Sequence, residues 1–474
     1  EFVLAPSESE PRGRITFTNL AEQTGSVWLA DVSLKPGGMI GLRANEVAGR
    51  VGIFTKTEFY SRPVPAQRDW IHFLWDTEDR YWSGMSRFLK DELKVRSLVV
   101  GTQMGWSPFP IQAKLDVIDS HSYWQHPRFP GRAWDMDNWS VQNISMAGAP
   151  DGGTLPHLAL ARVAGKPFIC TEYNHPAPNT FSSEAFLLLS AYAAMQDWDG
   201  IFAFAYSHRG GEWDTQKITS FFDIDQHPAK MVTLPAAAAM FVRGDLPTPA
   251  ARLRATVSQD AALERVRQAG PYLGADAFGI ERLAALRAAV ELGLDGAPAL
   301  HEMKQTAAAP AWVWGAGGKR VVTVDTARSK ALIGSIDPAD KFALGDVEID
   351  HVTSRQGWAA LSLTAIDGTS FRSPGHVLLT ATGDVENTGM KWKNAEKTSV
   401  GSDWGKAPTL VEGITARIAL PGAARGTTAW SLDERGQRKR AMPVGEAGGR
   451  ALLELGPKYQ TLWYEIEVGR LPMR

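Results

Sequence analysis

The chain has 474 residues, of which 44% are hydrophobic, and its 50 basic and 52 acidic residues give a formal net charge of −2. This composition predicts a globular protein of roughly two to four domains, and the absence of any long block of like charges argues against a nucleic-acid partner. A single cysteine, Cys170, excludes a disulfide framework and a multi-cysteine metal site. No apolar run reaches the roughly 18 residues of a membrane span, so no membrane partner is expected. The chain begins at Glu1 without an initiator Met or a signal-peptide pattern, which indicates that the natural N-terminus is absent.

Apolar and polar residues alternate through the first segment of the chain. Residues 14–18 and 26–34 have the period of β-strands, with a turn at Gly25 and a stop at Pro36-Gly37-Gly38. Two or three strands cannot bury a sandwich core, so we interpret this segment as the tail of a β-domain whose earlier strands are missing. The stretch GSVWLADVSLKPGG resembles the last strands of jelly-roll carbohydrate-binding modules of the cellulose-binding type. We therefore assign residues 1–42 to the tail of such a module.

Helix and strand patterns alternate from residue 43 to residue 246. Apolar residues recur every three or four positions from Gln67 to Leu93, which predicts a long amphipathic helix, and a buried strand is expected directly afterwards, from Val95 to Val100. Further strands are expected at 115–118, 167–172 and 200–206, and helices at 155–163 and 182–195. This alternation predicts a parallel α/β sheet.

The connections differ systematically in length. Those from helix to strand are short (Lys94, 164–166 and 197–199), whereas those from strand to helix are long (104–114, 122–154, 173–181 and from 207 onward). Long loops at the carboxyl ends of the strands are typical of (β/α)-barrel enzymes. Several aromatic residues occur on these loops or at strand ends: Trp106, Tyr123, Trp124, Trp134, Trp139, Tyr173, Tyr206 and Trp213. Their rings are suited to stacking on sugars, and the alternative is that they pack the loops against one another.

The stretch KPFICTEYNHPAPN, from Lys166 to Asn179, passes from a short apolar run into a crowded polar loop. Glu172 falls where the strand should end, which makes its carboxylate a candidate for catalysis. The alternative is a Glu that forms a salt bridge or caps the helix expected from Ser182, because paired carboxylates also occur in scaffolds.

The composition changes after Leu246. Residues 247–311 are rich in Ala and Arg with helical spacing, which predicts a helical connector. From Trp312 onward the β pattern returns, with strands expected at 320–325, 342–352, 358–366, 376–382, 414–418, 426–432, 450–453 and 461–468, so that residues 312–474 are predicted to form a C-terminal β-sandwich domain. The run RGQRKR at 435–440 fits a solvated hairpin edge. Asp223 to Pro228 fits a tight turn, with metal ligation as the alternative.

Several catalytic signatures are missing from the sequence. It contains no G-x-S-x-G, no H-E-x-x-H and no G-x-G-x-x-G that leads from a strand into a helix, so neither a metal nor a cofactor is expected. The remaining candidate for chemistry is a carboxylate at a strand end among aromatic and polar groups. Enzymes that cleave glycosidic bonds use carboxylates in this way.

Five stretches together carry a resemblance to a known family: RDWIHFLWDTEDRYW, VVGTQMGWSPFPIQ, DSHSYWQHPRFPG, KPFICTEYNHPAPN and QDWDGIFAFAYSH. In combination they resemble the clan-A glycoside hydrolases, and more closely a bacterial group of cellulase-like enzymes with a jelly-roll binding module inside the barrel. The resemblance implies an α/β fold in which residues 43–246 form the C-terminal half of a (β/α)8 TIM barrel, strands five to eight. It also implies that Glu172 is the nucleophile and that Tyr123 orients it. The resemblance further implies that His121 and Tyr123 match the His and aromatic positions after the sixth strand, and that Asn174 and His175 line the sugar subsite. With the loop aromatics Trp106, Trp124, Tyr206 and Trp213, these four residues make up the expected substrate-binding set.

The chain departs from that family at the general acid/base. The family places a Glu after an Asn at the end of the fourth strand, and strands one to four are not found in this sequence. Glu46 follows Asn45, but no buried strand leads into it, and Glu78 and Glu92 are expected to face solvent on the long helix. We therefore expect the acid/base to belong to a missing N-terminal half of the same polypeptide.

The leading expectation is a retaining glycoside hydrolase that acts on a β-linked oligo- or polysaccharide, for which a secreted or periplasmic location is favoured. A non-catalytic carbohydrate-binding or scaffold protein is the alternative. A third class, an acyl hydrolase, would need Ser207-His208 or Cys170 as its nucleophilic centre. Ser207 is not in a nucleophile elbow, and Cys170 is expected to be buried.

Overall fold

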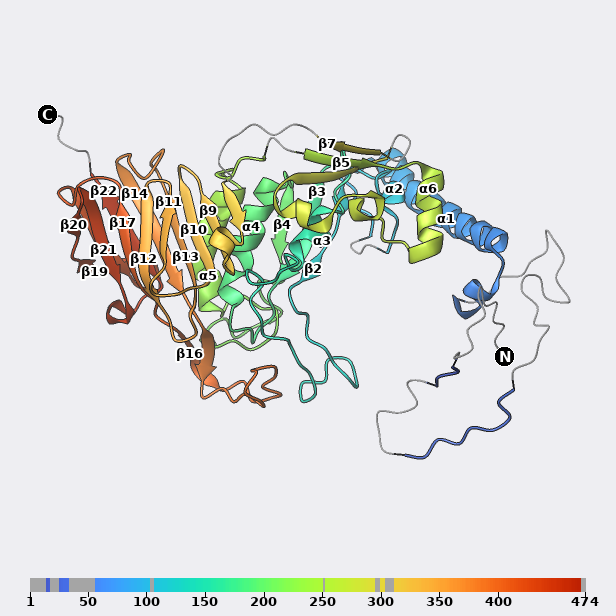
Figure 1. Cartoon of the computed structure of the whole chain (residues 1–474), viewed down its shortest axis with the longest axis horizontal. Coiled ribbons are helices and arrows are strands. Elements are labelled where there is room, and N and C mark those ends of the chain that lie inside the picture. Colours follow the sequence, from blue (N-terminus) through green and yellow to red (C-terminus); the bar gives the residue numbers. More distant parts are fainter. Residues whose placement is uncertain are drawn as a thin grey trace.

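The structure is a computed structural model that describes residues 14–17, 25–33, 56–102, 106–249, 252–294, 299–302 and 311–469. Four layers follow one another along its long axis: a parallel sheet, a pair of helices, a large antiparallel sheet and a smaller antiparallel sheet (Figure 1). The fold therefore mixes α/β and all-β architecture, as the sequence predicts.

A long helix precedes the sheet. The short η1 (Lys56–Ser61) leads into α1 (Val64–Arg87), and η2 (Phe88–Glu92) extends it, in agreement with the predicted amphipathic helix. Pro63 occupies the N-cap, where its missing N–H costs no hydrogen bond. The helix packs against α6 (Gln259–Ala269), to which it is tied by the ion pair between Arg68 and Glu264 at 3.0 Å.

The parallel sheet is built in chain order. β1 (Ile118–Asp119) and β2 (Ser122–Tyr123) pair with one edge of β3 (Phe168–Asn174), and β4 (Gly200–Ala203) pairs with the other edge. All of these pairings are parallel, as the sequence predicts. Within the described residues this sheet remains open and does not close into a barrel.

Three strand predictions in the N-terminal part fail. Residues 95–100 form no strand, and only Val100 makes an isolated parallel bridge, to Val117. The segment lies at the open edge of the sheet, with a neighbouring strand on one side only. Leu98, which was expected to be buried, is therefore 66% exposed. In the predicted module tail, residues 14–17 and 25–33 belong to no strand, and the rest of residues 1–42, like Glu46, lies outside the described residues.

The helices that follow the strands differ in length. α2 (Phe109–Gln112) and α3 (Leu155–Ala159) are short, whereas η3 (Ser182–Glu184) and α4 (Ala185–Met195) together form the predicted helix. α4 is apolar on all sides because it lies between the parallel sheet and the antiparallel sheet, beside α5 (Pro228–Phe241) (Figure 1). Both helices therefore belong to one core that joins the two halves of the molecule.

The predicted helical connector is only partly helical. Besides α6, η4 (Ala275–Phe278) and η5 (Arg282–Leu286), it contains a sheet in which β5 (Arg252–Thr256) pairs with β6 (Ala289–Gly293) and with β7 (Ala299–Glu302). β6 is fully buried, and Leu292 bridges to Val163 of the α/β part. The burial of β6 in this second contact overrides the helical propensity of a segment rich in Ala and Arg.

The C-terminal part is a sandwich of two antiparallel sheets, as predicted. The larger sheet has the order β19-β18-β22-β14-β13-β10-β9-β8, and the smaller has the order β11-β12-β17-β21-β20. The strands are β8 (Trp312–Trp314), β9 (Val321–Asp325), β10 (Ser329–Ser335), β11 (Lys341–Leu344), β12 (Val347–Thr353), β13 (Trp358–Ala365), β14 (Gly375–Thr382), β15 (Val385–Thr388), β16 (Lys406–Val411), β17 (Thr415–Leu420), β18 (Thr427–Leu432), β19 (Arg438–Met442), β20 (Gly445–Ala447), β21 (Arg450–Leu455) and β22 (Trp463–Val468), with η6 (Ala316–Gly318) and η7 (Pro457–Tyr459) between them.

The larger sheet is buried on both faces. Along β13, Trp358 and Ala360 belong to the core shared with the helices, whereas Leu361 and Leu363 belong to the core of the sandwich. This alternation follows from the two-residue period of a strand. The edge strand β19 carries the predicted solvated run, with the guanidinium of Arg438 3.6 Å from the ring centroid of Trp430.

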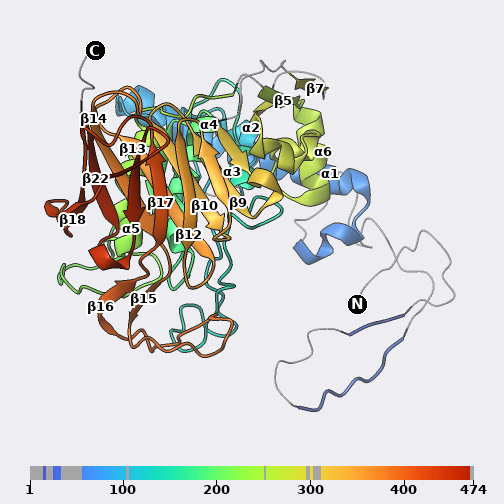
Figure 2. The same ribbon diagram turned by 60° about the vertical axis from the view of Figure 1, so that its left-hand side comes forward.

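A hairpin of the C-terminal part reaches the loops that follow the parallel strands. β15 and β16 form this hairpin, and both views place it beside the loop between β2 and α3 (Figures 1 and 2). The indole N–H of Trp139 donates to the carbonyl oxygen of Gly401 at 3.2 Å, and the rings of Trp139 and Trp404 stack with their centroids 5.9 Å apart. The C-terminal domain thereby supports the loops at the carboxyl ends of the parallel strands.

Candidate active site

A cleft of about 1000 Å³ lies at the carboxyl ends of the parallel strands. It is lined by residues from the strand ends, from the long loops that follow them, from α3 and from the connector: Trp106, His121, Ser122, Tyr123, His126, Trp134, Met136, His157, Glu172, Phe204, His208, Ser220, Phe221, Phe222 and Tyr272. The structure therefore brings together Glu172, His121, Tyr123 and Trp106 of the predicted site, in the position that the loop lengths predict.

Glu172 is the only carboxylate among the described residues that line this cleft. Its Oε2 accepts a hydrogen bond from the hydroxyl of Tyr123, which comes from the neighbouring strand β2. Burial and the nearby Glu172 carboxylate raise the pKa of Tyr123, so this residue remains a proton donor. Glu172 does not cap the helix that begins at Ser182, and it forms no ion pair with another described residue.

The backbone beneath Glu172 is fixed by a buried carboxylate. Asp119, at the end of β1, accepts hydrogen bonds from the hydroxyl of Thr171 at 2.8 and 2.9 Å and from the Thr171 N–H at 3.2 Å. Burial raises the pKa of Asp119 to about 6, while these hydrogen bonds act in the opposite direction. Because Thr171 directly precedes Glu172, Asp119 holds the strand end that presents the candidate nucleophile.

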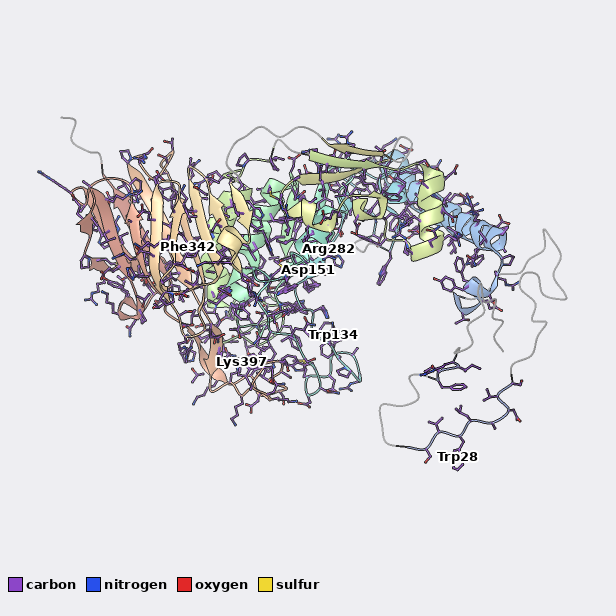
Figure 3. All side chains as sticks on the ribbon, in the orientation of Figure 1. Trp28, Trp134, Asp151, Arg282, Phe342 and Lys397 are labelled. Carbon is purple, nitrogen blue, oxygen red and sulfur yellow. The ribbon has the colours of Figure 1, made fainter. Side chains whose placement is uncertain are left out.

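One wall of the cleft is aromatic. The rings of Tyr123 and Phe222 lie 5.0 Å apart, those of His126 and Trp134 5.8 Å apart, and Phe204 joins the same cluster. Trp134 lies on the long loop between β2 and α3, below the strand ends in the view of Figure 3. The rings meet one another edge-to-face or tilted, so this wall is apolar and tightly packed.

A His–Asp pair stands at the rim of the cleft. Nδ1 of His208 is hydrogen-bonded to Oδ1 of the buried Asp223, which also accepts the N–H of His208 at 3.1 Å, and Arg209 forms an ion pair with Asp225. Both carboxylates of the predicted tight turn are therefore engaged with side chains of the preceding loop. The described residues contain no cluster of His, Cys, Asp or Glu suited to a metal ion.

Two predicted sugar-binding residues lie beneath the cleft and do not line it. Asn174 is fully buried and donates through Nδ2 to the carbonyl oxygens of Phe204 and Phe222, while Lys230 donates to its Oδ1 at 2.7 Å. His175 is fully buried as well and is hydrogen-bonded to the hydroxyl of Tyr173 at 2.9 Å. The prediction that they line the sugar subsite is corrected: β3 continues to Asn174, and the polar groups beyond Glu172 satisfy buried backbone instead.

The other predicted aromatic residues fall outside the cleft. Trp124 lines an adjoining cavity and donates through its indole N–H to the carbonyl oxygen of Ile144 at 2.9 Å. Tyr206 and Trp213 are 59% and 57% exposed and line none of the cavities described here. Trp139 is buried in the packing between loops, as the alternative for the loop aromatics predicts.

Other lining residues were not predicted from the sequence. Phe204 directly follows β4, so its position at a strand end was a usable signal, and the pair Phe221-Phe222 stands in the last long loop. Tyr272 comes from the connector, far along the chain, and stacks on His157 with ring centroids 4.5 Å apart. No local pattern in the sequence indicates that contact.

None of the described helices is both long and apolar enough to pass through a membrane. No protein-family model, curated protein or solved structure matches the chain.

Proposed function

We propose that the chain is the nucleophile-bearing part of a retaining glycoside hydrolase that acts on a β-linked oligo- or polysaccharide. The observation that carries the proposal is the Glu172 carboxylate, the only one among the described residues of the cleft, held by the Tyr123 hydroxyl in an aromatic cleft at the carboxyl ends of parallel strands. This is the function that the resemblance to clan-A glycoside hydrolases implies.

The proposed chemistry begins with attack of a Glu172 carboxylate oxygen on the anomeric carbon, which forms a glycosyl ester as the bond to the leaving oxygen breaks. The Tyr123 hydroxyl holds the carboxylate in one orientation during this attack. Water then hydrolyses the ester, and the two inversions together retain the configuration.

The reaction also needs an acid/base carboxylate roughly 5 to 5.5 Å from the nucleophile. No second carboxylate lines the cleft among the described residues, because Glu78 lies on α1 beside a different cavity and Asp119 is buried under Thr171. We therefore propose that this group comes from an N-terminal half of the same polypeptide, on the strands that would complete a (β/α)8 barrel.

The edges of the parallel sheet support this proposal. On β4, Phe202 is 54% exposed, and at the β1 edge of the sheet the described residues add only the bridge between Val100 and Val117. Along α1, Phe73, Leu74 and Tyr81 are exposed as well. Open edges and uncovered apolar side chains are what a half-barrel presents when its other half is not in place.

The test uses the chain together with its preceding segment, by fusion or co-expression, and compares Glu172→Gln with the control Glu78→Gln. We expect Glu172→Gln to bind the oligosaccharide but to lose several orders of magnitude in turnover of aryl β-glycosides, because an amide cannot form the glycosyl ester. Near wild-type turnover by this variant would remove Glu172 from the mechanism. Sugar binding without any turnover by the unmodified protein would favour the alternative, a non-catalytic carbohydrate-binding protein.

An acyl-hydrolase function receives no support from the geometry. Cys170 is fully buried, and burial raises the pKa of its thiol, so the reactive thiolate is disfavoured. Ser207 does not line the cleft, and the imidazole of its neighbour His208 is bonded to Asp223.

A further inference from the structure

A second cavity of about 660 Å³ opens beside the cleft. The two share Tyr123, His126 and His157 in their linings, so a chain of sugar units in the cleft can extend into it. The residues that line only the second cavity are Trp124, Gln125, Pro127, Arg128, Ser140, Val141, Gln142, Asp151, Gly153, Thr154 and Arg282. Its lining is more polar than the aromatic wall of the cleft.

The guanidinium groups of this cavity carry uncompensated charge. Arg128 and Arg282 are both exposed to the cavity solvent, and neither forms an ion pair with a carboxylate of the described residues. Asp151 is the one carboxylate among the described lining residues, and its Oδ1 accepts the N–H of Gly153 at 3.0 Å. The cavity therefore has an excess of positive charge.

Arg282 is held in place at this cavity. Its Nη2 donates to the carbonyl oxygen of Gly153 at 2.7 Å, and Figure 3 shows it close to Asp151, above the loop that carries Trp134. Gly153 has a φ of 64°, and a Cβ at this position would lie 2.4 Å from Cγ of Met146, so only glycine allows the loop to pass here. The backbone conformation at Gly153 therefore fixes the carbonyl oxygen that accepts the hydrogen bond from Arg282.

The neutral groups around the two arginines add donors. Nε2 of Gln125 is buried and has no hydrogen-bond partner among the described residues. Burial, together with the nearby Arg282, lowers the pKa of His157, so its ring is neutral near pH 7 and adds no charge. A ligand group that fits this set accepts hydrogen bonds and carries negative charge.

We propose that the second cavity is a subsite for an acidic sugar unit, in which the carboxylate of a uronic acid is bound by Arg282 and Arg128 while the neighbouring unit lies over Glu172. The planar guanidinium matches a carboxylate through paired hydrogen bonds. The inference rests on the proposed function, and it narrows the substrate to β-linked glycans that contain uronic acid.

The test compares, by calorimetry, the binding of two probes to the chain together with its preceding segment: the hexasaccharide of β-1,4-linked glucose and the hexasaccharide of β-1,4-linked glucuronate. We expect the acidic probe to bind about 10- to 100-fold more tightly, the effect of a charged hydrogen-bonded pair. Arg282→Gln should abolish this preference without changing the affinity for the neutral probe. Arg372→Gln, on the C-terminal sandwich, is the matched control and should keep the preference.

The outcomes separate this inference from the proposed function. Equal binding of both probes, or an Arg282→Gln variant that weakens both equally, overturns the acidic subsite and leaves the sugar cleft standing. Binding of neither probe overturns both. A preference for the acidic probe that weakens at high salt supports the subsite. Partial retention of this preference by Arg282→Lys supports it as well, because lysine keeps the positive charge but lacks the planar guanidinium that pairs with a carboxylate.

Discussion

The hydroxyl of Tyr123 donates the one side-chain hydrogen bond that the structure shows for the Glu172 carboxylate. A Tyr123→Phe substitution removes this bond and leaves the ring in its aromatic cluster. In the chain with its preceding segment, we expect turnover of activated aryl β-glycosides to fall about 10- to 100-fold with little change in KM, since a hydrogen bond to a charged group contributes about 1.5 to 3 kcal/mol. Unchanged turnover would show that Tyr123 does not orient Glu172.

Trp134 and Trp213 are similarly exposed, but only Trp134 lines the cleft. We therefore expect Trp134→Ala to weaken oligosaccharide binding by about 1 to 3 kcal/mol, a range taken from the stacking of bases on aromatic rings. Trp213→Ala is the matched control and should leave the affinity unchanged. Titration with cello-oligosaccharides measures the affinity of both variants. An equal loss of affinity in the two would contradict the assignment of Trp134 to the aromatic wall of the cleft.

Among the site residues, those that lie directly at the end of a parallel strand could be predicted from the sequence. Glu172 and Tyr123 were predictable because a buried run followed by a polar loop locates the end of a parallel strand. Asn174 and His175 were misplaced because the sequence does not show that β3 runs on to Asn174, where side chains turn to satisfy buried backbone groups.

At the scale of elements, a buried carboxylate joins a loop to the helical layer. Glu184, in η3, accepts hydrogen bonds from Ser145 and from the backbone N–H groups of Met146 and Ala147, and Nδ1 of His175 lies 3.5 Å from it. Burial raises the pKa of Glu184 from its ordinary value of 4.5 to about 7. The proton is therefore bound more tightly in the folded state than in the unfolded state.

This difference makes stability depend on pH. The contribution of Glu184 is fully present below about pH 4.5 and is lost as the pH rises through about 7. Glu184→Gln stays neutral, so the free energy of unfolding of the wild type, relative to this variant, should fall by about 3 kcal/mol between pH 4 and pH 8. Urea titrations at several pH values measure the difference. The exposed Glu454→Gln should follow the wild type, and a pH-independent difference for Glu184→Gln would contradict the assignment.

An element could be predicted from the sequence where buried and exposed residues alternate with the period of that element. The strands of the sandwich were found because two-residue alternation and turn residues mark many of them, as in β17. The strands β5 and β6 were missed because their Ala- and Arg-rich sequence has helical propensity, and only tertiary contacts, such as the bridge from Leu292 to Val163, select the extended form.

At the scale of the whole molecule, the parallel sheet has two unsealed edges. Leu98 and Phe202 stand exposed at these edges, and an uncovered strand edge is a template for pairing with another chain. We expect residues 1–474 alone to self-associate and to show no detectable glycosidase activity. Addition of the preceding half should give a monodisperse particle, as sedimentation velocity would show. A monomeric, active chain would contradict the half-barrel.

The general arrangement of the molecule was predictable in its order but not in its contacts. Alternation along the chain predicted a parallel sheet followed by a sandwich. It did not predict that the larger sheet of the sandwich would pack on α4 and α5, or that the hairpin of β15 and β16 would support the site loops. Such contacts join residues distant in sequence, for example Trp139 and Trp404, and no local pattern encodes them.

The most direct test of the central claim is covalent trapping of the nucleophile. A 2-deoxy-2-fluoro-β-glycoside with a dinitrophenolate leaving group needs no acid to depart, so it reports on the nucleophile itself. In the chain with its preceding half, we predict that one equivalent of sugar becomes attached and that peptide mapping places it on Glu172, with no labelling of Glu172→Gln. Attachment to another residue, or continued turnover without any trapped sugar, would contradict the account.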